Sequence, residues 1–184
     1  MRKVIAAINM TLDGYCDHTA VDANAEIHQH YTDLLNSGGT ALYGRTTYKL
    51  MEDYWPTLIK TPSGTKSMDD FAKAIDNIPK VVFSRTLKNL NWETARLSKK
   101  SIKDEVLGLR QEPGKDIFVC SPSLIVQCGN LGLIDEYQLC VHPVIVGKGL
   151  PLFKNVEDRS TLKLVKTKLF NAGAVILYYT PTKK

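Results

Sequence analysis

Three short turns carry the side chains best suited to binding an anionic ligand. They occupy residues 44–47, 84–86 and 120–123, and each follows a short apolar run. A strand that ends in a hydroxyl-rich turn and then opens a helix leaves free backbone N–H groups and the positive end of the helix dipole facing a ligand. This geometry suits the phosphates of a nucleotide cofactor. The candidate cofactor-binding residues in the turns are Gly44, Arg45, Thr46, Thr47, Ser84, Arg85, Cys120, Ser121 and Ser123.

The first two turns illustrate the chemistry and its alternative. Gly44 lets a ligand approach the backbone, Thr46 can cap the following helix, and Arg45 or the threonines can bind phosphate. The same residues also fit a plain capped helix with a solvent-exposed arginine, and the first turn alone does not distinguish the two. In the second turn, hydroxyl groups beside Arg85 form the basic, hydrogen-bonding site that a 2′-phosphate needs.

Candidate proton donors are fewer. Asp13 follows the first predicted strand in an Asp-Gly turn, so it is either a turn former, which the spacing alone favours, or a carboxylate at the mouth of a central strand. Glu26 and His30 are four residues apart on a predicted helix and share a face. They either pair at the surface or, if that face lines a pocket, act as an acid and a base.

Cysteine and histidine spacing gives no indication of a metal site. The cysteines are Cys16, Cys120, Cys128 and Cys140, none in a C-x-x-C pair, and no histidines have the H-E-x-x-H spacing. Three of the four thiols lie in apolar segments, which favours buried free cysteines over disulfides or zinc ligands. We therefore expect no metal.

The elements that must position these turns alternate along the chain. The early strands and helices alternate, which indicates a parallel sheet, and an Asn-Ala-Gly turn at residues 171–173 joins two final strands into an antiparallel hairpin. Residues 54–66 are expected to be irregular. The predicted strands are residues 4–8, 40–43, 81–83, 92–97, 117–120, 137–146, 162–170 and 174–180; the predicted helices are residues 22–36, with Asp22 as cap, and residues 45–52, 67–76, 101–111 and 124–130.

Because the carboxyl ends of parallel strands meet at one edge of a sheet, the three turns are expected to converge on one ligand site. The chain has no G-x-G-x-x-G sequence, and Gly147-Lys148-Gly149 lacks the spacing and the following helix of a phosphate loop. The site would therefore bind a nucleotide without either of these common motifs.

Length and charge are those of an ordinary soluble globular protein. The chain has 184 residues, which predicts a single domain over residues 1–184, and its net charge of +5 comes from scattered lysines and arginines. Scattered basic residues give little support for nucleic-acid binding but can steer an anionic cofactor. No apolar run approaches the roughly 20 residues of a membrane helix. We expect a cytoplasmic protein.

Taken in order, these segments resemble the dihydrofolate reductase-like fold, specifically the riboflavin-biosynthesis reductase domain (RibD C-terminal type), over nearly the whole chain. Residues 7–15 (AINMTLDGY) resemble that family's first strand and S-L-D-G turn, with Thr11 in place of serine. The remaining matches are residues 42–48 to G-R-x-T-Y, 81–85 to V-x-S-R, 131–136 to G-L-x-D-E and 143–153 to P-x-x-x-G-x-G-x-x-L-F.

The resemblance implies a three-layer α/β/α fold whose mixed, mostly parallel sheet ends in the antiparallel hairpin. It also implies NADPH as hydride donor, a pteridine- or pyrimidine-like substrate and a homodimer. The first turn would hold the cofactor phosphates, Ser84 and Arg85 the adenosine 2′-phosphate, and the backbone of Ile8 would face the nicotinamide carboxamide. Glu26 lies on the helix that dihydrofolate reductases use for their acid.

One departure affects the cofactor site. The family has Gly-Gly after the strand at residues 117–119, where this chain has Cys120 and Ser121 followed by Pro122. Side chains there narrow the approach of a pyrophosphate, and proline removes a backbone donor. The hydroxyls of Ser121 and Ser123 could act as donors instead.

Two functions follow from these residues. The first is an NADPH-dependent reductase of a small heteroaromatic, imine or carbonyl substrate, resembling 5-amino-6-(5-phosphoribosylamino)uracil reductase, with Asp13 or Glu26 as proton donor. The chain has no H-x-E and P-C-x-x-C of a zinc deaminase portion. The second is a non-catalytic nucleotide- or pterin-binding protein on the same fold, because fold does not imply function. No sequence motif supports a third function, nucleic-acid binding.

Overall fold

The protein forms one mixed sheet flanked by helices. Its structure is a computed structural model that describes residues 1–21 and 23–182. The strands are β1 (Val4–Thr11), β2 (Thr40–Gly44), β3 (Lys80–Phe83), β4 (Ala95–Leu97), β5 (Ile117–Val119), β6 (Glu136–His142), β7 (Leu162–Leu169) and β8 (Val175–Pro181). The helices are α1 (Ala25–Ser37), α2 (Arg45–Lys60), α3 (Lys66–Asn77), α4 (Ile102–Gln111) and α5 (Pro122–Asn130).

The strand order is β4-β3-β2-β5-β1-β6-β8-β7. Strands β1 to β6 pair in parallel, whereas β8 pairs antiparallel with both β6 and β7. The turn of the final hairpin contains Gly173 at φ +85°, a backbone conformation that favours glycine. The predicted mixed, mostly parallel sheet with an antiparallel C-terminal hairpin is therefore confirmed.

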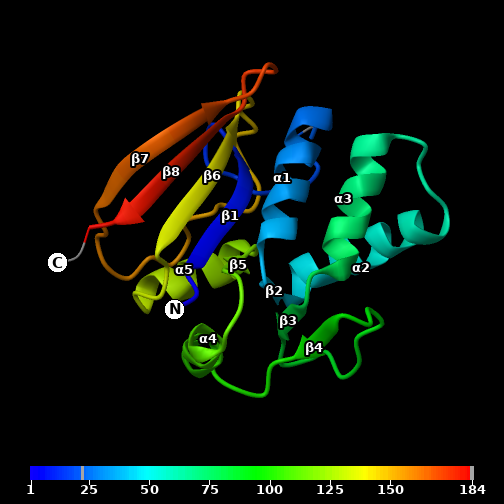
Figure 1. Ribbon diagram of the computed structural model, residues 1–184. Coiled ribbons are helices and arrows are strands. Elements are labelled where there is room, and N and C mark those ends of the chain that lie inside the picture. The colour runs from blue at the N-terminus through cyan, green and yellow to red at the C-terminus, as the bar shows by residue number, and fades with distance from the viewer. Residues whose placement is uncertain (22, 183–184) are drawn as a thin grey trace.

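Helices cover both faces of the sheet, as Figure 1 shows. Alternate residues of β1 point to opposite faces, so Val4 packs with Val106 of α4 and Ile125 of α5, whereas Ile5 packs with Leu35 of α1 and Ile75 of α3. The result is the three-layer α/β/α arrangement with an apolar core on each side of the sheet. Within the described residues, no helix has the length and apolar character needed to cross a bilayer.

The structure corrects several predicted boundaries: strand β1 continues to Thr11, and β4 begins at Ala95. Helix α2 continues to Lys60 through Pro56, so the first half of the stretch predicted to be irregular is helical. Strand β6 ends at His142, because Pro143 has no N–H to donate to the ladder. Helix α1 begins at Ala25 with the side chain of Asn24 as its cap, and the predicted cap Asp22 lies outside the described residues.

Glu26 and His30 share one face of α1, as predicted, but this face contacts the C-terminal hairpin. A Glu26 carboxylate oxygen accepts a hydrogen bond from the backbone N–H of Asn171 at 2.9 Å. The His30 ring packs against Phe170, and its Nδ1 lies 3.3 Å from the Lys168 ammonium. Burial, with a smaller contribution from the nearby lysine charge, lowers the pKa of His30 to about 4.

This environment predicts a pH-dependent loss of stability. Because the pKa of His30 is lower in the folded chain than its ordinary value of 6.5, the unfolded chain binds the proton more tightly, and stability falls as pH drops from 6.5 towards 4. The variant His30→Phe keeps a ring against Phe170 but cannot bind the proton. Between pH 7 and pH 5 we expect its free energy of unfolding to fall by less than that of the wild type, the difference being on the order of 1–2 kcal/mol. Urea unfolding at both pH values measures this difference. The same loss in both proteins would contradict it, and His18→Phe, which changes an exposed imidazole, is the control.

Candidate cofactor-binding site

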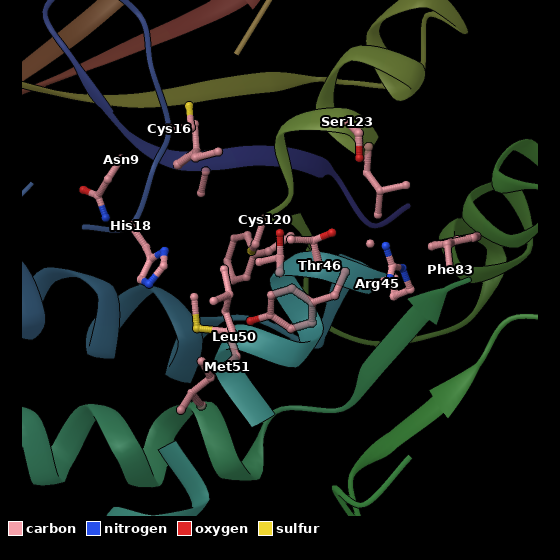
Figure 2. Close-up of a pocket in the computed structure, with 18 of the residues that line it drawn as sticks. Asn9, Cys16, His18, Arg45, Thr46, Leu50, Met51, Phe83, Cys120 and Ser123 are labelled. Atoms are coloured by element: carbon pink, nitrogen blue, oxygen red, sulfur yellow. The ribbon is translucent and has the colours of Figure 1, made fainter. Parts of the chain in front are cut away.

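A cavity of about 1300 Å³ opens along the edge of the sheet where β2, β3 and β5 end, beside residues 7–9 of β1, and Figure 2 shows its lining. Small-ligand pockets typically enclose roughly 300–1,000 Å³, so this one has room for a dinucleotide and a second small molecule. The structure therefore brings together the three predicted turns. Of the predicted cofactor-binding residues, Ile8, Gly44, Arg45, Thr46, Thr47, Ser84, Arg85, Cys120 and Ser123 line the cavity.

Two helix N-termini meet in this cavity. Helix α2 begins at Arg45, and its N-cap Gly44 has no side chain to bond the free N–H groups of the first turn. Helix α5 begins at Pro122, and its N-cap Ser121 makes no side-chain cap bond either. A Cβ added at Gly44 would lie 3.5 Å from Ser123 Oγ, which shows how closely the two turns approach. Their free N–H groups and dipoles together favour an anion.

Ser121 supports this arrangement without lining the cavity. Its buried hydroxyl accepts a hydrogen bond from the backbone N–H of Gly44 at 2.8 Å and so ties the end of β2 to the start of α5. The departure from Gly-Gly therefore places one hydroxyl behind the site, and the cavity beside Cys120 stays open.

Basic side chains line the end of the cavity next to β2, β3 and β4. Arg45 and Arg85 follow β2 and β3, and Lys99 and Lys100 follow β4. The loop that carries the lysines is held by Ser98, whose hydroxyl accepts from the Lys100 N–H at 3.2 Å and donates to the buried Glu105 carboxylate at 2.7 Å. This end of the cavity is therefore suited to a phosphate group.

The opposite end begins at Asn9, on β1. Its side-chain oxygen accepts a hydrogen bond from the Tyr31 hydroxyl at 3.2 Å and lies 2.9 Å from His142 Nε2, which donates in the tautomer that carries the proton there. Tyr31 comes from α1 and His142 from β6, so one helix and one neighbouring strand fix the orientation of the carboxamide. Asn9 and Tyr31 line the cavity.

An aromatic wall adjoins this end. The His28 ring of α1 lies 6.1 Å from the ring of Trp55 and 5.7 Å from that of Phe71, centroid to centroid. Burial lowers the pKa of His28, so its ring is uncharged at neutral pH. An apolar wall with an uncharged ring suits a flat, uncharged ligand.

The two lining thiols are unreactive in this environment. Burial raises the pKa of both Cys16 and Cys120 to about 12, and the charge of Asp17 adds to the effect at Cys16. Only a thiolate is an effective nucleophile or metal ligand, so both cysteines act as packing residues. The described residues contain no cluster of three histidine, cysteine or carboxylate side chains that could hold a metal ion.

Comparison with known proteins agrees with this architecture. The family model of the RibD C-terminal domain matches residues 2–176. The chain belongs to the RibD C-terminal domain family. It is 35% identical over 186 aligned residues to the uncharacterized protein YyaP of Bacillus subtilis (strain 168), which covers 97% of this chain and 94% of that protein. The predicted family is therefore confirmed.

Solved structures show the same fold. A putative riboflavin biosynthesis protein from Shewanella sp. PV-4 superposes with a TM-score of 0.72 at 17% identity, covering 100% of both chains. A diaminohydroxyphosphoribosylaminopyrimidine deaminase/5-amino-6-(5-phosphoribosylamino)uracil reductase from Thermotoga maritima gives a TM-score of 0.66 at 18% identity, covering 98% of this chain and 57% of that one. The predicted dihydrofolate reductase-like fold of this RibD C-terminal domain is confirmed.

In this RibD C-terminal domain, neither of the carboxylates predicted as proton donors lines the cavity. The Asp13 carboxylate accepts hydrogen bonds from the Thr11 hydroxyl at 2.6 Å and from the Gly147 N–H at 2.7 Å. The Thr11 bond is the largest cause of its lowered pKa, which keeps the group ionised at neutral pH. Glu26 is engaged by the hairpin at Asn171. The structure thus places Asp13 in the turn beside Gly147 and Glu26 at the C-terminal hairpin, and the identity of the proton donor stays a prediction.

We therefore expect Asp13→Asn to destabilise the loop at Gly147 and to leave cofactor binding unchanged. The amide cannot accept from the Thr11 hydroxyl and the Gly147 N–H as strongly as a carboxylate does. The unfolding midpoint should fall by a few degrees while the Kd for NADPH stays within about twofold, less than the 1.4 kcal/mol of a tenfold change. A variant with an unchanged midpoint that loses turnover would instead return Asp13 to proton transfer.

Several lining residues were absent from the sequence prediction. Lys99 and Lys100 were visible as an adjacent basic pair before a helix, and only the sheet topology brings them to the cavity. Asn9 directly follows the predicted Ile8, but its orientation depends on Tyr31 and His142, which are 22 and 133 positions further along the chain. No local pattern could have identified His28, because a half-buried histidine in an amphipathic helix is ordinary.

Proposed function

We propose that the protein is an NADPH-dependent oxidoreductase that reduces a small heteroaromatic substrate. Membership of the RibD C-terminal domain family supports an oxidoreductase that uses a nicotinamide cofactor. The single observation that carries the proposal is the meeting of the α2 and α5 N-termini in a cavity whose far wall is basic. Paired free N–H groups beside guanidinium and ammonium groups are what a dinucleotide phosphate chain requires.

The lining residues fit this cofactor along its length. The N–H groups of the first turn of α2, together with Thr46 and Thr47, would hold the pyrophosphate, and Ser123 would add a hydroxyl donor. Ser84 and Arg85 would bind the adenosine 2′-phosphate at the basic end. The Ser84 hydroxyl oxygen accepts from the Leu87 N–H at 2.9 Å, which fixes this turn. The backbone of Ile8 would then face the nicotinamide.

When bound, the nicotinamide supplies the hydride. The chain orients the two ligands and excludes water, since Leu50, Met51 and Trp55 of α2 form an apolar wall of the cavity. A pteridine- or pyrimidine-like substrate suits that wall. The name of the Thermotoga protein includes the reduction of a substituted uracil, which supports a substrate of this chemical class.

The test is a titration of the purified protein with NADPH and, separately, NADH, followed by nicotinamide fluorescence. We expect micromolar binding of NADPH and at least about tenfold weaker binding of NADH, because NADH lacks the 2′-phosphate that the basic wall would bind. Oxidation of NADPH is then screened over a panel of pterins and pyrimidines at 340 nm. The absence of binding of either nucleotide would overturn the proposal.

A non-catalytic nucleotide- or pterin-binding protein is the second candidate. It is favoured by the position of Asp13 and Glu26, since both carboxylates are engaged outside the cavity. NADPH binding without oxidation over the whole panel would favour this function. Turnover of any member would exclude it.

A further inference from the structure

The substrate end of the cavity contains a hydrogen-bond donor that the fold orients and that is bonded by none of the residues that the structure describes. The side-chain oxygen of Asn9 is engaged by Tyr31 and His142, so the amide nitrogen must point the other way. Figure 2 shows this nitrogen directed to the side of the cavity where His18 lies. Among residues 1–21 and 23–182, none accepts a hydrogen bond from it. Its two N–H groups therefore face the space that a ligand would fill.

The orientation is specified by the fold. A carboxamide whose oxygen accepts from two donors is held in one of its two flipped orientations. In the other orientation its own N–H groups would face the donors of Tyr31 and His142. His142 is buried on β6, and Tyr31 reaches the site from α1, so both partners are themselves fixed by the core. A rigid donor whose partners are preorganised loses little entropy when a ligand binds.

Charge distinguishes this end from the cofactor end. The basic lining residues follow β2, β3 and β4, whereas Asn9 lies on β1, and β5 separates β1 from β2. At about 4.8 Å per strand, β3 lies roughly 14 Å from β1. The charged lining residue in the loop that follows β1 is the anionic Asp17, which accepts from the Leu150 N–H at 2.6 Å. Among the described lining residues, no lysine or arginine therefore lies beside Asn9 to bind an anionic group on the substrate, and the ionisable side chain nearest its amide is that of His18.

We propose that Asn9 determines substrate specificity by donating its amide hydrogen to a carbonyl oxygen or ring nitrogen of an uncharged, unphosphorylated heterocycle. Tyr31 and His142 are positioning residues that act through it. This inference rests on the proposed function, because the cofactor must occupy the basic end for the substrate to lie against Asn9. It separates this chain from enzymes whose substrate carries a phosphate.

The test uses two pterins that differ in charge. Binding of 6-hydroxymethylpterin and of pterin-6-carboxylate to the protein saturated with non-fluorescent NADP⁺ is followed by pterin fluorescence. We expect the neutral pterin to bind at least about tenfold more tightly than the anion, and Asn9→Leu to weaken the neutral pterin about tenfold, the value of one lost hydrogen bond. Equal binding of the two pterins, or an unchanged Kd in Asn9→Leu, would overturn the proposal.

The positioning role is tested by a double-mutant cycle. His142→Leu should weaken 6-hydroxymethylpterin several-fold, and His142→Gln, which restores a donor, should recover the affinity. If His142 acts through Asn9, adding His142→Leu to Asn9→Leu should cost nothing further. Additive losses would overturn that role, as would a parallel loss of NADP⁺ affinity. If NADP⁺ does not bind at all, the proposed function fails and this inference fails with it, whereas NADP⁺ binding with an unchanged pterin Kd in Asn9→Leu overturns this inference alone.

Discussion

Gly44→Val is expected to raise the Kd for NADPH at least about 100-fold while the protein stays folded. The backbone of Gly44 has φ −78° and ψ 161°, which any residue adopts, so the substitution creates no backbone strain. A Cβ at this position lies in ordinary contact with Ser123 Oγ at 3.5 Å and with Ser121 Oγ at 3.7 Å. The two methyl groups beyond it would fill the space between the two helix N-termini, where the phosphates are proposed to bind.

Comparing Gly44→Ala with Gly44→Val distinguishes steric exclusion of NADPH from unfolding of the protein. Gly44→Ala should give an intermediate Kd, because its single methyl group fits without displacing Ser123. Gly108→Ala on α4 is the matched control, since its added Cβ meets only the Lys100 ammonium at 3.8 Å. Nicotinamide fluorescence gives the Kd, and thermal unfolding followed by circular dichroism reports the fold. A folded Gly44→Val variant that binds NADPH with the wild-type Kd would place the phosphates elsewhere.

The sheet and the three turns were predictable from the sequence because their information is local. A buried parallel strand is a short apolar run, and the residues that end it are next to it in the chain. Parallel strands then bring Gly44, Ser84 and Ser123 to one edge by a general rule of sheet geometry. The convergence of the three turns on one cofactor site could therefore be predicted from the order of the strands and helices.

The substrate end was not predictable in the same way. The orientation of Asn9 depends on hydrogen bonds with Tyr31 and His142, which lie on a helix and on the neighbouring strand β6. Asp13 was selected because it follows the first strand, and Glu26 because it lies on the helix that dihydrofolate reductases use for their acid. Their backbone partners belong to loops more than 130 residues away. Such partners are set by tertiary structure, which no local pattern reports.

Helix α2 shows tertiary packing overriding a local rule. Pro56 predicts a break, since proline removes a helical hydrogen bond, yet the helix continues to Lys60. The preceding residue, Trp55, packs on Phe71 of α3 with a centroid distance of 4.5 Å and bonds Met51 through its indole N–H at 3.1 Å. These contacts hold the second half of the helix against α3 and make the aromatic wall of the cavity part of a regular element.

Arg85→Ala is expected to remove the preference for NADPH over NADH. The Kd for NADPH should rise about 10–100-fold, because a charge-assisted hydrogen bond contributes roughly 1.5–3 kcal/mol, whereas the Kd for NADH should stay within about twofold. Arg85 is exposed on the turn after β3 and lines the basic end of the cavity, so its truncation leaves the core intact. Lys88→Ala, an exposed lysine outside the cavity lining, is the matched control.

The two nucleotides locate the charge that Arg85 binds. A loss confined to NADPH places the guanidinium at the 2′-phosphate, and the salt dependence of NADPH binding should weaken in parallel because one exposed cation has been removed. Equal losses for both nucleotides would move Arg85 to the pyrophosphate that they share. An unchanged Kd for NADPH would assign the 2′-phosphate to Lys99 and Lys100, which line the same end of the cavity from the loop after β4.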